Sequence, residues 1–144
     1  MTHTKSSKPL RTAIAIAVAA SAVLVTIYYY GGVAGQADAT PLRAALVGSV
    51  GALIAGVAMW RLNRARYEDA AVDRVGRRAA VLAPAAVVSL AGFWIGITVP
   101  ISAAAFVFGR RSAVEGRRAL GYASCAAASV AVAASVVLCV IGAS

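Results

Sequence analysis

Four long apolar stretches alternate with short polar stretches along the chain. The apolar stretches cover about residues 12–33, 42–60, 79–108 and 119–141, and Arg43, at the edge of the second, is the one charged residue within them. A helix needs about 20 residues to cross a hydrocarbon core of roughly 30 Å, and each stretch reaches about that length. The pattern predicts an all-α, polytopic membrane helical bundle with four transmembrane helices.

The polar stretches supply the connections of this expected bundle. Residues 1–11 are basic and are expected to form a disordered tail, whereas 12–144 form a single transmembrane bundle. Residues 61–78, with six Arg and three acids, are the largest polar loop, and 109–118 add four Arg and one Glu. Aromatic and basic residues at the ends of membrane spans favour the headgroup layer. The residues expected there are Arg61, Arg64, Arg66, Arg77, Arg78, Trp60, Tyr28, Tyr29 and Tyr30.

A cleaved signal peptide is an alternative for the first apolar stretch. Ala37-Asp38-Ala39 has the small-x-small form of a cleavage site. The apolar stretch is longer than the 7–15 residues of a signal-peptide core, and three tyrosines lie between that core and the site. We therefore expect a retained membrane span.

The third apolar stretch is too long for one simple crossing. Its 30 or so residues would extend about 45 Å as a straight helix, and they include Pro84, Gly92, Gly96 and Pro100. Four crossings with a cytoplasmic N-terminus would put the four Arg of 109–118 outside, against the usual excess of basic residues inside. The alternative is three crossings plus a re-entrant third segment that turns near Gly92–Gly96, which puts 109–118 inside. We favour four crossings, because each re-entrant arm would be too short to span.

Small residues recur at four-residue spacing within the apolar stretches. In lipid, helices associate through close packing of such residues. Gly92 and Gly96 form a GxxxG pair, and Pro100, one turn later, should kink or end the third helix. The residues predicted to pack helix on helix are Gly48, Ala52, Gly56, Gly92, Gly96 and Gly121.

The composition of the chain limits the kinds of chemistry that it can perform inside a membrane. The chain is 61% hydrophobic with a net charge of +9, and its one histidine, His3, lies in the tail. Proton relays and ion-coupled transport normally use ionisable groups inside the membrane, and intramembrane proteolysis by Ser needs a His or Lys partner. We therefore expect no catalytic, cofactor-binding or metal-binding residue, no cofactor and no enzymatic activity. The positive charge fits membrane loops better than nucleic acid, which we exclude as a partner.

Residues 90–142 resemble a family of small Gly/Ala-rich membrane hairpin domains from high-GC Gram-positive bacteria. The family pattern is a Gly-spaced helix, a Pro, a helix end at Gly-Arg, a basic turn, and a Gly-Arg segment that opens the next helix. The matching residues are Gly92, Gly96, Pro100, Gly109-Arg110-Arg111, Gly116-Arg117-Arg118-Ala119 and Gly121. The family has no established activity, so the resemblance implies a hairpin architecture with a cytoplasmic basic turn.

These observations lead to one functional expectation and two alternatives. We expect a multi-pass cell-membrane protein with a cytoplasmic N-terminus that acts as an accessory, assembly or scaffold subunit of an envelope complex. Its expected partners are a bilayer with anionic headgroups and either another membrane protein or a second copy of the chain. A pore-forming, holin-like protein is the first alternative. A lipid- or drug-binding transporter subunit is the second.

Overall fold

The computed structural model describes residues 6–30, 41–68 and 72–143 of the 144-residue chain. Its elements are α1 (Lys8–Tyr30), α2 (Pro41–Glu68), α3 (Val72–Val88), the 3₁₀ segment η2 (Ser89–Ile95), α4 (Thr98–Val114) and α5 (Arg118–Ala143). Four of the helices are long and apolar enough to cross a membrane: α1, α2, α3 with the beginning of η2, and α5. The prediction of a membrane helical bundle is confirmed.

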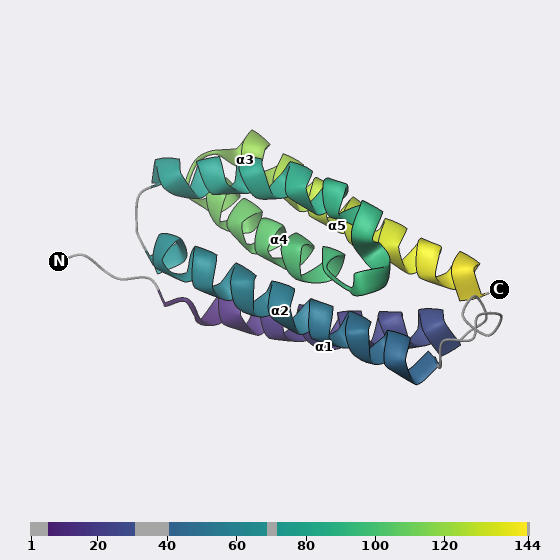
Figure 1. Ribbon diagram of the computed structural model, residues 1–144. Helices are drawn as coiled ribbons and strands as arrows, with labels where there is room; N and C mark the ends of the chain where they lie inside the picture. The colour runs from purple at the N-terminus through teal and green to yellow at the C-terminus, as the bar shows by residue number, and fades with distance from the viewer. Residues whose placement is uncertain (1–5, 31–40, 69–71, 144) are drawn as a thin grey trace.

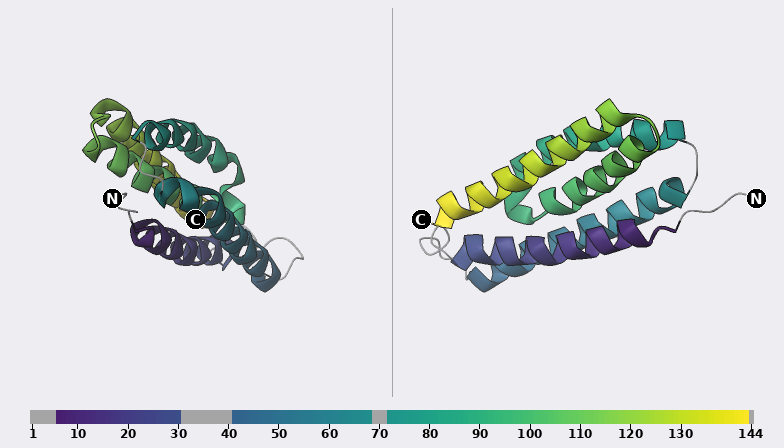
Figure 2. Two further views of the ribbon diagram at one scale, coloured as in Figure 1. Left: turned by 90° about the vertical axis from the view of Figure 1, so that its left-hand side faces the viewer. Right: turned by 180° about the vertical axis from the view of Figure 1, so that it is seen from behind.

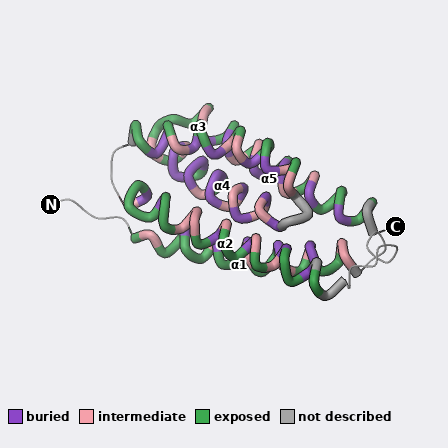
Figure 3. Tube along the Cα trace, viewed as in Figure 1, coloured by how far each residue is buried: buried purple, intermediate pink, exposed green. Residues whose placement is uncertain are grey.

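The helices form two layers (Figure 1). One layer is the antiparallel pair α1 and α2, and the other holds α3, α4 and α5, as the end-on view also shows (Figure 2). Helix α4 lies between its neighbours and contacts all four of the other α-helices. Its residues Ala104, Ala105 and Phe108 are fully buried, and Figure 3 shows how much of α4 is enclosed. The centre of the bundle is therefore built on small side chains around Phe108.

The third apolar stretch forms two helices and not the single span that we expected over 79–108, and its first helix ends well before Pro100. Helix α3 ends at Val88, η2 follows, and α4 runs back alongside α3 in the opposite direction (Figure 1). Gly96 has a φ of +72°, a left-handed conformation that glycine adopts without steric cost. The hydroxyl of Thr98 closes the turn by donating to the carbonyl oxygen of Ser89 at 2.8 Å. Pro100 lies in the first turn of α4, where a missing N–H is tolerated.

This hairpin returns the chain to the end of the bundle that it left. Arg117, in the turn before α5, makes an ion pair with Asp73 at the start of α3. The expectation that 109–118 and 61–78 lie at opposite ends of the bundle is therefore wrong, and the turn lies where the re-entrant alternative placed it. The turn also stops short of the far end, which α1, α2 and α5 reach (Figures 1 and 2). The charge bias was a better guide to this segment than its length.

Two other boundaries differ from the expectation. Helix α1 begins at Lys8, with Pro9 in its first turn and Leu10 fully buried, so the prediction of a disordered tail over 1–11 is wrong for 8–11. Helix α2 continues past Trp60 to Glu68, and α3 begins within the polar segment 61–78. Residues 1–5, the proposed cleavage site Ala37-Asp38-Ala39 and the end of the first span at 31–33 lie outside the described residues.

Candidate functional site

The polar residues gather where five helix ends meet. These are the start of α1, the end of α2, the start of α3, the end of α4 and the start of α5, and we call this region the charged end. Three contacts between distant parts of the sequence connect it: Ser7 with Glu68, Arg111 with Tyr67, and Arg117 with Asp73. The charged end is therefore one connected surface and not a set of separate loops.

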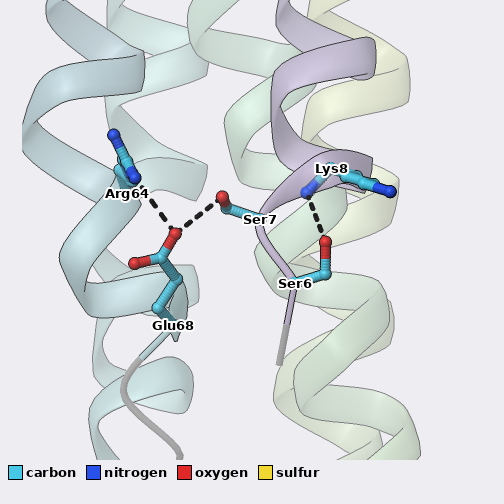
Figure 4. A network of polar contacts seen from close by, with 5 residues as sticks. All are labelled: Ser6, Ser7, Lys8, Arg64 and Glu68. Carbon is cyan, nitrogen blue, oxygen red and sulfur yellow. Dashed lines mark hydrogen bonds and ion pairs between the residues drawn. The ribbon is translucent and has the colours of Figure 1, made fainter. Parts of the chain in front are cut away.

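Glu68 joins α2 to the residues that precede α1 (Figure 4). The hydroxyl of Ser7 donates to Glu68 Oε1 at 2.7 Å, and Arg64 Nε donates to the same oxygen at 3.3 Å. These two hydrogen bonds favour the carboxylate and hold the pKa of Glu68 below its ordinary value, with the Ser7 bond as the larger cause. The guanidinium of Arg64 also lies 5.7 Å from the centre of the Trp60 ring.

Arg111 is the buried cation of the charged end. Its side chain is only 6% exposed, and its Nε donates to Glu115 Oε1 at 2.9 Å, one helical turn further along α4. Its Nη1 donates to the backbone carbonyl of Tyr67, and its guanidinium lies 4.8 Å from the centre of the Tyr67 ring. The Tyr67 ring in turn meets Phe108 edge to face, with the ring centres 5.5 Å apart. Arg111 thus connects α4 to α2.

The role of Arg111 differs from the expectation for 109–118, in which Arg111 is one of four arginines in a loop. Helix α4 extends to Val114, so Phe108, Arg111 and Glu115 share one helical face. Their spacing of three and four residues is visible in the sequence. Because a loop was expected over 109–118, this helical spacing was not considered there.

A second basic cluster lies between α2 and α3. Four arginines, together with Val81, line a cavity of about 420 Å³, and they are Arg66, Arg74, Arg77 and Arg78. Arg66 and Arg77 are exposed and Arg78 is half-buried. Clustered guanidinium groups at a membrane surface suit anionic groups such as phosphates or carboxylates.

The residues predicted to lie at the headgroups fall at both ends of the bundle. Arg61 is exposed and Trp60 half-buried at the charged end, whereas Tyr28 and Tyr29 lie near the far end of α1. The Tyr28 and Tyr29 rings meet edge to face with centres 5.2 Å apart. The side chain of Tyr30 lies outside the described residues. Contact of these residues with lipid stays a prediction.

The residues predicted to pack helices lie at three different contacts. A Cβ at Gly56 would collide with Val18 of α1, and one at Gly96 would stand 3.0 Å from the carbonyl oxygen of Gly48 and 3.1 Å from Ala52 Cβ. Gly121 lies against α4. Gly92 has a φ of −117° at the kink inside η2, so Gly92 and Gly96 do not form the GxxxG helix face that the spacing predicted.

Among the described residues, no three His, Cys, Asp or Glu side chains gather closely enough to hold a metal ion. The two cysteines, Cys125 and Cys139, are both free thiols in α5. The described residues place several guanidinium groups at one end of the bundle, and such groups suit ionic contacts.

The similarity of residues 90–142 to the membrane hairpin family stays a prediction. No protein-family model, no curated protein and no solved structure matches the chain.

Proposed function

We propose that this protein is a non-enzymatic subunit of the cell membrane, with its N-terminus and charged end in the cytoplasm, that helps to assemble or hold an envelope complex. The connected charged end carries the proposal. Three contacts between segments far apart in the sequence hold its helix ends together, so its exposed arginines form a prearranged cationic surface. Prearranged groups lose less conformational freedom on binding than mobile ones.

The orientation follows from the distribution of charge. Of the basic residues that the structure describes, Arg43 alone lies at the far end, at the start of α2. Short cytoplasmic segments carry an excess of Lys and Arg in membrane proteins. The cytoplasmic leaflet also attracts basic residues, by about 1 kcal/mol each near its surface. Both effects favour a cytoplasmic charged end.

The partner that fits this surface is a membrane protein with an acidic cytoplasmic segment. Arg61, Arg66 and Arg77 are exposed there and can pair with carboxylates at the level of the headgroups. Complementary charge gives such a contact its specificity and a faster association rate.

Affinity purification from native membranes after mild crosslinking tests this function. The wild-type chain should retain one partner at a fixed ratio, and the triple variant Arg61→Gln, Arg66→Gln, Arg77→Gln should lose it. Arg43→Gln, which removes a charge at the far end, is the matched control and should keep the partner. If expression of the wild-type chain instead depolarised the membrane and no protein were retained, the pore-forming alternative would replace this proposal.

A further inference from the structure

A groove runs from the charged end down one side of the bundle, between α1 and α4. Its upper part has a volume of about 720 Å³, and its lower part of about 510 Å³ also touches α5. Four residues line both parts, so the two form one continuous groove, and they are Ala13, Ile16, Phe106 and Val107. From Lys8 to Ala20 the groove follows α1 for about 18 Å, at 1.5 Å per residue. That length matches one leaflet of a hydrocarbon core of roughly 30 Å.

The groove is charged at one end and apolar along the rest. Lys8, Arg110 and Arg111 line its upper end together with Glu115, which gives an excess of positive charge. Lys8 points away from Glu68 and Arg64 (Figure 4), and Arg110 is exposed. The lower part is lined by Ala, Val, Ile and Phe side chains, with Ser102 and Ser129 as its polar residues.

Arg111 adds a third positive charge to the upper end of the groove. It is 7% exposed, and two of its nitrogens are used by Glu115 and by the Tyr67 carbonyl. Its Nη2 is buried and has no hydrogen-bond acceptor among the described residues. A buried guanidinium N–H without an acceptor costs free energy. The positive charge of Arg111 also attracts an anion at the upper end of the groove. Arg111 lines that groove.

The geometry points to an anionic phospholipid as the occupant, with its phosphate near Lys8, Arg110 and Arg111 and one acyl chain along the groove between α1, α4 and α5. The cationic upper end of the groove matches the phosphate of a phospholipid, and the apolar lower part matches its acyl chain. The apolar face of a partner helix would use the lower part but would leave the cations unpaired. Basic pockets between membrane helices on the cytoplasmic side are known to suit such headgroups. This site is separate from the exposed arginines of the proposed partner surface.

Native mass spectrometry of the delipidated protein, titrated with dioleoylphosphatidylglycerol or dioleoylphosphatidylcholine in mixed micelles, tests the assignment. The wild-type chain should bind phosphatidylglycerol more tightly than phosphatidylcholine. The double variant Lys8→Ala, Arg110→Ala should bind phosphatidylglycerol about 30-fold more weakly, from about 1 kcal/mol per basic residue. The loss for phosphatidylcholine should be smaller, because its choline cation offsets the charge of the phosphate that the two lipids share. A second double variant, Arg61→Ala with Arg118→Ala, removes the same amount of charge elsewhere at the charged end. It should keep the preference for phosphatidylglycerol over phosphatidylcholine.

A second pair of variants tests the acyl-chain part. Ala103→Trp would fill the lower groove and should weaken binding of both lipids. Ala123→Trp, at an exposed position of α5 on a different helix face from the groove-lining Ser129, should not. Equal binding of the two lipids by the wild-type chain would overturn the proposal. The proposal would also be overturned if both double variants lost the same phosphatidylglycerol affinity. Binding of Ala103→Trp to lipid as tightly as the wild-type chain would overturn it too.

Discussion

Gly109 of α4 and Gly121 of α5 bring two helix backbones into direct contact. A Cβ at residue 121 would stand 2.5 Å from the carbonyl oxygen of Gly109, and a Cβ at residue 109 would stand 2.9 Å from the carbonyl oxygen of Gly121. Both distances are too short for a carbon and an oxygen that are not bonded. The two glycines therefore set how closely α5 packs on the hairpin.

Substitution of Gly121 by alanine should separate these helices. The added methyl group would meet backbone atoms of Gly109 and Ala113, which cannot rotate away, so we expect a loss of about 1–3 kcal/mol, typical of overpacking. Thermal unfolding in detergent would measure it. Ala126→Val, at an exposed position of the same helix, should be close to neutral. Equal melting temperatures for the two variants would contradict a tight α4–α5 contact.

The turn of the hairpin should distinguish Gly96 from Gly92. Gly96→Ala forces an L-residue to a φ of +72° and places its Cβ 3.0 Å from the Gly48 carbonyl, so we expect a cost of at least about 1–2 kcal/mol. Gly92 has a φ of −117°, which alanine adopts easily, so Gly92→Ala should be mild. Thermal unfolding in detergent would compare the two variants, and Gly96→Ala should have the lower melting temperature. A GxxxG helix face would give similar losses at both positions.

Removal of Arg111 should take away a guanidinium that a buried carboxylate pairs with. The side chain of Glu115 is 10% exposed, so Arg111→Leu should cost about 3–5 kcal/mol of stability. Arg111→Leu with Glu115→Leu should cost less than Arg111→Leu alone, because no charge is then left buried. Chemical denaturation in mixed micelles would measure both. Arg118→Leu, at an exposed site, is the control, and a double variant no more stable than the single one would count against the ion pair.

The pKa of Glu68 should depend on Ser7. In the wild-type chain it lies below the ordinary value, so the stabilisation it brings is present above the unfolded-state pKa and is lost as the pH falls through the lowered folded-state pKa. Ser7→Ala should raise the pKa toward 4.5. Ser6→Ala should not, because the Ser6 hydroxyl accepts from the backbone N–H of Lys8. Carbon-13 NMR titration of the Glu68 carboxyl group would detect the shift, and identical titrations in both variants would rule out the Ser7 bond.

Labelling with a membrane-impermeant maleimide should place Ala65 and Ala119 on the same side of the membrane. The hairpin returns the chain to the charged end, so Ala65→Cys and Ala119→Cys should react together, and Arg43→Cys should react from the opposite side. A Cys125→Ala, Cys139→Ala background removes the native thiols. Labelling of Ala65→Cys and Ala119→Cys from opposite sides would restore four crossings with 109–118 outside.

Helix positions could be predicted from the sequence because lipid requires about 20 apolar residues for each span. The turn at Gly96 could not be assigned in the same way, because a glycine in a helix and a glycine at positive φ look identical in a sequence. The charge bias favours one end of the bundle for both 109–118 and 61–78, and the structure places both there, whereas residue count favours opposite ends. Arg111 was missed for a different reason: its burial depends on Tyr67, 44 residues earlier, and no local pattern reports that contact.

The short reach of the α3–α4 hairpin gives the molecule unequal ends. Five helix ends meet at the charged end among the described residues, whereas α1, α2 and α5 alone reach the far end and the hairpin turn stops before it (Figure 2). The body is a wedge, wider at one membrane surface than at the other. In a flat bilayer, lipid must fill the space beyond the turn. A bilayer that bulges outward on the side of the charged end leaves less space beyond the turn and so accommodates the wedge better than a flat one. We therefore expect the protein to be enriched in membrane regions with this curvature.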